Sequence, residues 1–356
     1  MPTLRIATFN VENLFERAKV LNFHNNITGD KKLVKISELQ EELAKTTYDK
    51  PAILKLYKEL KEYITVVETR EKLFDRSKKK VVVNGRNDWD GFISFKPEKF
   101  TEDARKNTAK VIRSVNADIC CLIEVESRPV LKHFFADRLS STGNFEKYSH
   151  LMLIDGNDTR GIDVALASRY RIKKIISHID DKKSNKLIFS RDCLELEIES
   201  PYGTIWVLVN HFKSKGYGVQ SVSNNKRLAQ SEKVAEILQN YNLKNEMVVV
   251  AGDLNDTPGS APLAPLLSTN NLYDVLEAKY PNKADRWSYH YKKNEQIDYL
   301  LVSKPLHNIL SNSGVERKGI FKIEEYSNNT IKAFPTVKTY TDSASDHGMV
   351  WADFSF

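Results

Sequence analysis

Short apolar runs recur along most of the chain and predict a protein rich in β-strands. Strands outnumber helices, and many follow one another directly, as in two packed sheets with helices on their outer faces. Helices are predicted at residues 103–115, 129–139 and 225–238. The predicted strands are 4–9, 118–125, 148–154, 161–167, 172–178, 193–199, 204–210, 247–251, 297–302 and 348–354.

Residues 22–100 interrupt this pattern and predict a charged helical hairpin followed by a β-ribbon at 81–83 and 91–95. Between Lys31 and Lys80 there are 14 Lys and Arg against 9 Asp and Glu, a net charge of +5 (14 − 9). The segment is either a solvated insertion or a basic arm that contacts a phosphate backbone, and the pattern favours neither. The apolar residues at helical spacing are Leu33, Ile36, Leu39 and Leu43 in the first helix, and Ile53, Tyr57, Leu60, Ile64 and Val67 in the second.

Composition limits the class of protein more than its function. The 356 residues are 41% hydrophobic and 28% charged, which is ordinary for a globular protein. The net charge of +7 leans weakly toward polyanionic partners. Three cysteines without metal-ligand spacing suggest neither a disulfide framework nor a zinc site. No signal peptide and no membrane-spanning run is recognised, so we expect a cytoplasmic protein with no obligate protein partner.

Polar residues that could carry chemistry stand where predicted strands begin or end. Each is weak evidence by itself, because Gly-Asp-Leu-Asn is usually a turn and a Glu after a strand is usually solvated. Together they suggest a shared site, since carboxylates are costly to bring together unless a cation neutralises them. Carboxylate and amide oxygens suit a hard ion such as Mg²⁺, with Mn²⁺ as a possible substitute. These residues are Asn10, Glu12, Glu124, Asn210, His211, Asp253, Asn255, Asp298, Asp346 and His347.

The order of the motifs resembles the endonuclease/exonuclease/phosphatase superfamily, which includes deoxyribonuclease and exonuclease III-like enzymes. The resemblance covers residues 4–354 except for 22–100, and the spellings look most like a bacterial branch of predicted nucleases. It implies a four-layer α/β sandwich of two mixed β-sheets flanked by helices, formed by residues 1–356 as a single domain with 22–100 as an insertion. The motifs are Phe9-Asn10-Val-Glu12-Asn13-Leu, Asp118-Ile-Cys-Cys-Leu-Ile-Glu124-Val, Gly161-Ile-Asp-Val-Ala, Asn210-His211-Phe-Lys-Ser, Gly252-Asp253-Leu-Asn255, Gln296-Ile-Asp298-Tyr and Ser345-Asp346-His347.

The resemblance also implies a role for each site residue. Lys213, on the loop after His211, could in addition contact a flanking phosphate. From its chemistry, Asp253 is the best candidate for the general base, and Asp298 would keep the ring of His347 protonated. The implied metal ligands are Glu12, Glu124 and Asp346, the implied phosphate-binding residues are Asn10 and Arg191, and the implied catalytic residues are His211, Asp253, Asn255, Asp298 and His347.

The leading functional hypothesis is therefore a Mg²⁺-dependent nuclease that hydrolyses phosphodiester bonds of DNA or RNA by in-line attack of an activated water. One alternative is a phospholipid or inositol-phosphate hydrolase of the same superfamily, although the sequence shows no basic amphipathic helix with exposed aromatic residues. The other alternative is an inactive nucleic-acid-binding protein. Every superfamily position that can be placed is filled, which argues against loss of activity.

Overall fold

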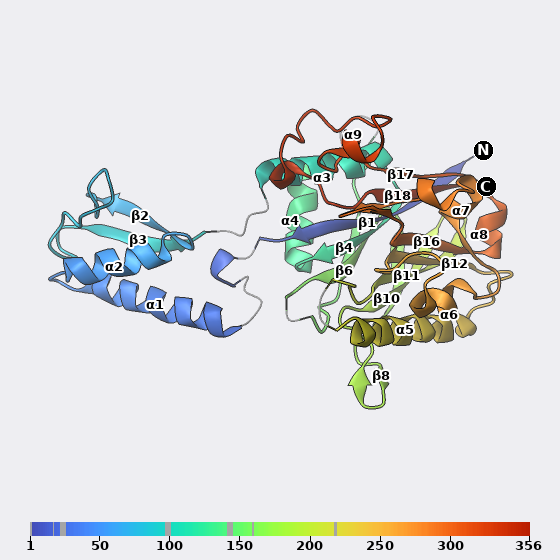
Figure 1. Cartoon of the computed structure of the whole chain (residues 1–356), viewed down its shortest axis with the longest axis horizontal. Helices are drawn as coiled ribbons and strands as arrows, with labels where there is room; N and C mark the ends of the chain where they lie inside the picture. The colour runs from blue at the N-terminus through green and yellow to red at the C-terminus, as the bar shows by residue number, and fades with distance from the viewer. Residues whose placement is uncertain are drawn as a thin grey trace. The chain divides into compact units, whose positions relative to one another are not determined.

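The structure, a computed structural model, describes residues 2–16, 18–21, 26–96, 101–140, 145–158, 160–216 and 219–356. The chain divides into two compact units, which are residues 1–14 with 100–356, and residues 15–99. The predicted boundaries of the insertion, Asn22 and Phe100, lie outside the described residues. The larger unit contains two six-stranded sheets, and the smaller contains two helices and a two-stranded ribbon (Figure 1).

The first sheet of the larger unit is mixed, with strand order β17-β18-β1-β4-β6-β5. Strand β1 lies between β18, its antiparallel neighbour, and β4, its parallel neighbour. The two strands closest to the N-terminus of this unit are therefore central in the sheet. Its strands are β1 (Thr3–Leu14), β4 (Ile119–Val125), β5 (His150–Leu153), β6 (Asp163–Ser168), β17 (Leu310–Glu316) and β18 (Met349–Ser355).

The second sheet is also mixed, with strand order β13-β16-β12-β11-β10-β7. Strands β11 and β12 are parallel, and the remaining neighbours are antiparallel. Its strands are β7 (Arg171–Ile176), β10 (Cys193–Ser200), β11 (Gly203–His211), β12 (Met247–Asp253), β13 (Leu272–Asp274) and β16 (Asp298–Ser303). Two small hairpins lie outside it, β8 (Lys182–Lys183) with β9 (Lys186–Leu187), and β14 (Tyr289–His290) with β15 (Asn294–Glu295).

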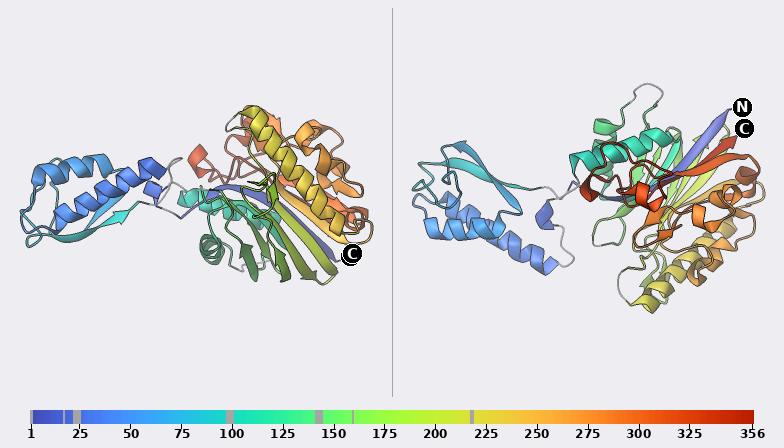
Figure 2. Two further views of the ribbon diagram at one scale, coloured as in Figure 1. Left: turned by 90° about the horizontal axis from the view of Figure 1, so that it is seen from below. Right: turned by 45° about the horizontal axis from the view of Figure 1, so that its top comes forward.

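Alternation along the strands builds the layers. In β4, Cys120 and Leu122 pack toward α3 (Glu102–Val115) and α4 (Arg128–Arg138), while Cys121 points into the core between the sheets. The outer face of the second sheet packs against α5 (Gln220–Ile237) and α6 (Ala264–Leu267). This is the predicted four-layer α/β sandwich, seen from two further directions in Figure 2. The remaining helices of this unit are α7 (Val275–Lys279), α8 (Lys304–Asn308) and α9 (Ile323–Tyr326).

The unit of residues 15–99 has its own hydrophobic core around Trp89, whose side chain is fully buried. Helices α1 (Asn26–Ala44) and α2 (Lys50–Leu60) supply one side, and the ribbon of β2 (Ile64–Arg70) and β3 (Asp90–Phe95) supplies the other. Helix α1 and the ribbon strand at 91–95 agree with the sequence. The prediction that one family domain spans the chain with 22–100 inserted into it stays a prediction.

Two predictions for this unit were wrong. The second helix ends at Leu60, and Ile64 and Val67 lie in strand β2. The β-branched run at 64–67 pairs with β3, so backbone hydrogen bonding to a neighbouring strand prevailed over the apparent helical spacing. Residues 81–83 are not the second ribbon strand, because Val81 forms only an isolated bridge with Phe74. Across both units, no helix among the described residues is long and apolar enough to cross a membrane.

Candidate active site

Three neighbouring strands of the second sheet place candidate residues in one row. His211 on β11 is the register partner of Asp253 on β12, and Asp253 is the partner of Asp298 on β16. The other sheet contributes Asn10 from β1, whose Nδ2 donates to Asp253 Oδ2 at 3.1 Å. The row therefore lies where the two sheets meet. Strand β1 continues to Leu14 and β11 to His211, so Asn10, Glu12 and His211 lie within strands and the predicted strand ends at these positions were too early.

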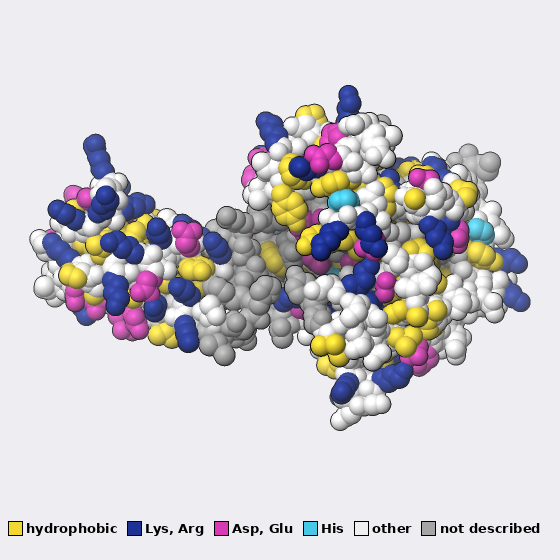
Figure 3. Space-filling model, in the orientation of Figure 1, with side chains coloured by type: hydrophobic (Ala, Val, Ile, Leu, Met, Phe, Trp, Pro, Cys, Tyr) yellow, Lys and Arg dark blue, Asp and Glu magenta, His cyan; other side chains and the backbone are white. Residues whose placement is uncertain are grey.

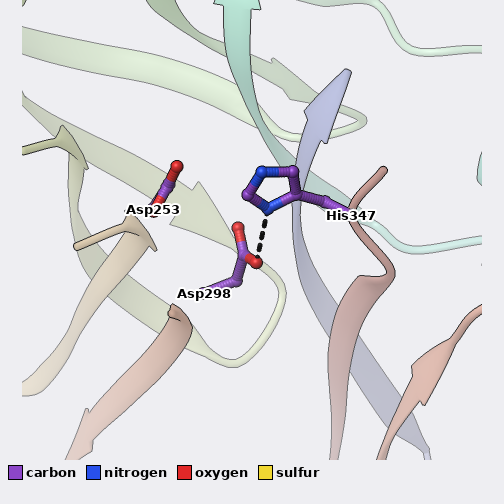
Figure 4. Close-up of side chains that lie close together, drawn as sticks. All are labelled: Asp253, Asp298 and His347. Carbon is purple, nitrogen blue, oxygen red and sulfur yellow. Dashed lines mark hydrogen bonds and ion pairs between the residues drawn. The ribbon is translucent and has the colours of Figure 1, made fainter. Parts of the chain in front are cut away.

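His347 and Asp298 form a buried, charged hydrogen-bonded pair (Figure 4). His347 Nδ1 lies 2.8 Å from Asp298 Oδ2, and Asp298 is fully buried. Ser288 Oγ donates to the same carboxylate oxygen at 2.6 Å and accepts from the backbone of Asp298. The ring of Tyr289 lies against that of His347, with 4.7 Å between the ring centroids. With Nδ1 occupied by Asp298, the ring presents Nε2 to the site.

Asp253 and Asn255 are held together on the turn after β12. The backbone N–H of Asn255 donates to Asp253 Oδ1 at 2.8 Å, and its Nδ2 donates to Asp253 Oδ2 at 3.1 Å. The same amide group donates to the carbonyl of Phe212 at 3.1 Å. Gly252 makes this turn possible, because it has φ 137° and a Cβ would lie 1.9 Å from the carbonyl oxygen of Asn210.

The three predicted metal ligands lie in the same region but are not all in mutual contact. Glu12 accepts hydrogen bonds from the backbone N–H of Asp346 at 2.9 Å and from Tyr340 Oη at 2.6 Å. Glu124 Oε1 lies 3.7 Å from His211 Nε2, which is also 3.7 Å from Asp253 Oδ2. Asp346 Oδ1 lies 3.6 Å from His347 Nε2. The acidic residues thus surround the two histidines.

Three of these acidic and amide residues have strained backbones, among twelve non-glycine residues with positive φ in the described part of the chain. Glu12, Glu124 and Asn255 all have left-handed backbones, with φ of 49°, 68° and 54°. A side chain makes this region unfavourable for a residue such as Glu, by about 1–2 kcal/mol. Such strain persists where surrounding structure imposes it, and it often marks functional sites. Two of the three strained residues are predicted metal ligands.

Burial sets the protonation states of the site. It raises the pKa of Asp253 to about 7, with Asp298 adding to the rise, and it raises the pKa of Asp346 to about 8. Burial also raises the pKa of Glu12. For His347 burial alone would lower the pKa, but Asp298 and Asp346 outweigh it and raise the pKa well above its ordinary value. Burial lowers the pKa of His211 well below its ordinary value, with Arg191 adding to the effect.

The two histidines therefore differ in charge at neutral pH. His347 is a cation, able to donate a charged hydrogen bond from Nε2, and His211 is neutral. Asp253 titrates near neutrality, which suits a group that accepts a proton and releases it again. The site combines a proton acceptor, a cationic donor and a neutral donor within one row.

The donor set of the site fits a hard divalent cation. Among the described residues, one group has ligand atoms that all lie within 4.8 Å of one another, namely Asp253, Asp298 and His347. A ligating histidine must be neutral, whereas His347 is protonated and hydrogen-bonded to Asp298, so this group is better suited to hold a proton than a metal. Burial raises the pKa of Glu12 and of Asp346, and a neighbouring cation would favour their ionised forms. Together with Glu124 they offer the carboxylate oxygens that a hard cation prefers.

Arg191 and Lys213, predicted to bind phosphate, lie beside this row. Arg191 is only 2% exposed, and its Nη1 donates to the Phe212 carbonyl at 3.4 Å. Lys213 follows Phe212, and its backbone N–H donates to Gln230 Oε1 at 2.8 Å. The guanidinium of Arg191 and the backbone of Lys213 are therefore anchored next to His211.

Sequence reasoning missed three residues that orient the site. Ser288 and Tyr340 bond to Asp298 and Glu12, and Ser345 Oγ donates to the carbonyl of Asn10 at 2.7 Å while accepting from the backbone of His347. Ser345 adjoins the Asp346-His347 pair and could have been suspected from its position. Ser288 and Tyr340 lie in loops with no local pattern that indicates a site.

A family of known proteins matches most of the chain. The endonuclease/exonuclease/phosphatase family matches residues 66–348. The chain belongs to this family.

Curated relatives in this family match part of the chain. Phospholipase C of Staphylococcus aureus is 27% identical over 173 residues, which are 44% of this chain and 49% of that protein. Sphingomyelinase C of Leptospira interrogans is 26% identical over 210 residues, which are 54% of this chain and 35% of that protein. The chain thus spans half or less of the length of these relatives.

Solved structures show the same fold. An endonuclease/exonuclease/phosphatase family protein from Bacteroides thetaiotaomicron is 13% identical with a TM-score of 0.51, and the match covers 100% of this chain and 96% of that one. An AP endonuclease from Archaeoglobus fulgidus is 18% identical with a TM-score of 0.50, over 70% of this chain and 93% of that one. At these identities the likeness is one of fold.

Proposed function

We propose that the protein hydrolyses phosphodiester bonds of nucleic acid, either DNA or RNA, in a reaction that depends on a divalent metal ion. The observation that carries this proposal is the row of His211, Asp253 and Asp298 with His347 hydrogen-bonded to Asp298. This row supplies a proton acceptor and a cationic donor in one buried place. A phosphodiester needs both, because it repels an incoming nucleophile and gains charge in the transition state.

Each side chain has a role that follows from its contacts. Asp253, fixed by Asn10 and Asn255, accepts the proton of a water placed in line with the leaving oxygen. His347 donates from Nε2 to a non-bridging phosphate oxygen, and Asp298 keeps its ring charged and oriented. Neutral His211 donates a hydrogen bond on the opposite side of the row.

Glu124 would hold the metal ion together with Glu12 and Asp346, and Mg²⁺ is the ion we propose for this set of oxygen donors. When bound, the ion supplies positive charge that offsets the charge of the phosphate. Asn10, Arg191 and Lys213 would contact phosphate oxygens, since Asn10 bonds to Asp253 and the two cations lie beside Phe212. Arg and Lys are well suited to this role because both carry charged hydrogen-bond donors.

A second candidate function is hydrolysis of a phospholipid. The observation in its favour is the 26–27% identity to proteins named phospholipase C and sphingomyelinase C. The net charge of +7 and the cations beside His211 favour nucleic acid instead. Cytoplasmic location and the absence of an obligate protein partner stay predictions.

One experiment separates these functions. Purified protein is incubated with supercoiled plasmid, single-stranded RNA, or sphingomyelin vesicles, each in Mg²⁺, Mn²⁺ or EDTA. We expect cleavage of a nucleic acid in Mg²⁺ or Mn²⁺, its loss in EDTA, and its loss in the His347→Ala variant. Activity is compared per folded molecule, because the variant leaves the buried carboxylate of Asp298 without its partner and should be less stable. Cleavage of sphingomyelin alone would move the substrate to lipid, and cleavage that persists in EDTA would refute metal dependence.

A further inference from the structure

Two arginines meet on one carboxylate next to the catalytic row. Arg160 donates from Nε and Nη2 to the two carboxylate oxygens of Asp158, each at 3.0 Å. Arg191 Nε lies 3.1 Å from Asp158 Oδ2. Asp158 therefore holds two guanidinium groups side by side, of which Arg191 is buried and Arg160 is partly exposed.

The loop segment 154–158, which ends at Asp158, is firmly attached to the surrounding structure. Asp163 accepts from the backbone N–H of Gly156 at 2.8 Å, and Asn157 Nδ2 donates to the carbonyl of Ile179 at 2.7 Å. A Cβ at Gly156 would lie 3.0 Å from the Cα of Arg191, so the loop packs directly on the backbone of that arginine. The arginine pair is thus a built part of the fold.

One shared acceptor joins the arginine pair to the catalytic row. The carbonyl of Phe212 accepts from Arg191 Nη1 at 3.4 Å and from Asn255 Nδ2 at 3.1 Å. Asn255 in turn donates to Asp253. Arg160 also lies close enough to His211 to contribute to the lowering of its pKa. Arg191 is therefore connected to Asp253 through the carbonyl of Phe212 and the side chain of Asn255.

Two lysines complete the cationic cluster. Lys213 follows β11, and Lys226 lies on α5, and both side chains are partly buried. Burial lowers the pKa of each lysine, and Arg191 adds to the lowering while Asp158 opposes it. Both lysines therefore lie within electrostatic range of the pair of Arg191 and Asp158, and repulsion among these cations favours an anion near them.

We propose that Arg160, Lys213 and Lys226 form a second phosphate subsite, which binds the phosphate next to the scissile one in a nucleic-acid strand. Arg191, held by Asp158 and Phe212, lies between this subsite and the catalytic row. The proposal rests on the proposed function. A nucleic acid repeats its phosphates at every nucleotide, whereas a choline phospholipid has one phosphate and a cationic headgroup that the guanidinium groups would repel.

The test compares substrates with one phosphate and with several. Rates are measured on bis(p-nitrophenyl) phosphate, which has a single phosphodiester, and on an oligonucleotide with one cleavage position. In two further oligonucleotides, a neutral methylphosphonate replaces the phosphate on one side or the other of that position. With unmodified protein, we expect kcat/KM to fall about ten- to hundredfold for one of the two, because a charge-assisted contact is lost.

Variants assign the effect to residues. Arg160→Gln and Lys226→Gln should raise KM for the oligonucleotide by about tenfold each and leave hydrolysis of bis(p-nitrophenyl) phosphate little changed. The methylphosphonate that lowers kcat/KM of the unmodified protein should cause little further loss of kcat/KM in either variant. Lys233→Gln is the matched control, because Lys233 lies on the same helix and contacts Asp181 and Glu236 instead.

Each outcome decides between the two proposals. If unmodified protein cleaves both methylphosphonate oligonucleotides as fast as the parent, the second subsite is refuted while phosphodiester hydrolysis stands. Equal losses on both substrate classes in the Arg160 variant would also refute it, because the residue would then act on the catalytic row. If the unmodified protein cleaves no phosphodiester in Mg²⁺ or Mn²⁺, the proposed function itself fails.

Discussion

The charge of Asp298 can be removed almost without changing the shape of the site. Asp298 Oδ2 accepts from both His347 Nδ1 and Ser288 Oγ, and Oδ1 has no hydrogen-bond partner among the described residues. In Asp298→Asn, a carbonyl oxygen at the Oδ2 position keeps both hydrogen bonds, and the amide nitrogen takes the position of Oδ1. The variant therefore tests whether a protonated His347 is needed.

The size of the effect follows from the geometry. At 2.8 Å, two unit charges in a medium of effective dielectric constant near 20 attract by about 6 kcal/mol before the cost of burying them. Without the charge of Asp298, only Asp346 and Asp253 oppose the lowering of the pKa by burial, so the pKa of His347 falls and we expect the ring to lose its proton more readily near neutral pH. Losing one charged donor to the transition state reduces kcat by about 10²- to 10³-fold.

The assay is the pH dependence of kcat for the variant relative to the unmodified protein. Because the raised pKa of His347 keeps its ring protonated through neutral pH in the unmodified protein, the ratio should be lowest at neutral and alkaline pH. It should recover as the pH falls below about 6, where the variant ring regains its proton. Asp298 also adds to the raised pKa of Asp253, so Asp253 should titrate at lower pH in the variant, and the full pH profiles of both proteins are compared to separate the two titrations.

Asp274→Asn is the matched control, because Asp274 is a partly buried carboxylate on the neighbouring strand β13 and bonds to Gln296 instead of to His347. Its activity per folded molecule should be unchanged. If Asp298→Asn retains most of its activity at neutral pH, or if its ratio does not rise in acid, the role assigned to the His347–Asp298 pair is wrong.

Three further predictions concern strain, pH and charge. Glu124 has a left-handed backbone, which glycine adopts without strain. In urea unfolding, Glu124→Gly should therefore be about 1 kcal/mol more stable than Glu124→Ala, although both variants should be inactive. Equal free energies of unfolding would contradict this. Burial would lower the pKa of His178, but hydrogen bonds to Glu195 and Asp181 raise it, so its stabilisation is present at low pH and lost as the pH rises through the raised pKa. His178→Gln should therefore destabilise more near pH 6 than near pH 9, by about 1 kcal/mol, and the reverse order would refute the ionic pair. Replacing lysines 78–80 by Gln should flatten the salt dependence of nucleic-acid binding by about 0.7–0.9 per lost phosphate contact, and an unchanged slope would make the segment structural.

The last of these predictions concerns the unit of residues 15–99, which carries lysine and arginine side chains over its visible face (Figure 3). The binding should be measured with an inactive His347→Ala protein, so that cleavage does not distort the isotherm. Lys55 and Lys58 on α2 offer a control pair of lysines within the same unit.

Most strands of the two large sheets were predictable because they are short apolar segments with little competing signal. Residues 247–251, for example, became β12, which extends two residues further to Asp253. Strands β13 and β17, which are short or largely polar, were not predicted. The helix at 53–67 was not predictable to its end. Ile53, Tyr57 and Leu60 are buried at helical spacing, and buried Ile64 continues the spacing although it lies in a strand. The spacing of apolar residues indicates which side chains are buried. It does not show whether the backbone forms hydrogen bonds within a helix or with a neighbouring strand.

The candidate site was predictable as a set of residues and not as a geometry. Ordered motifs indicated His211, Asp253 and Asp298, but only the register of three strands puts them in one row. The contacts of Ser288 and Tyr340 depend on loops that meet residues far away in the chain, and a local pattern has no information about them. The roles assigned to individual site residues stay predictions until the variants are measured.

The position of β18 has a consequence for synthesis of the protein. Strand β1 is made first, yet its antiparallel neighbour in the sheet is the strand at Met349–Ser355, and His347 immediately precedes that strand. During synthesis, β1 therefore cannot pair with β18 until residues 349–355 have been made. Nascent and prematurely terminated chains lack His347 and β18, so they should be inert. The candidate site is thus completed only after residues 347–355 have been made and β18 has paired with β1.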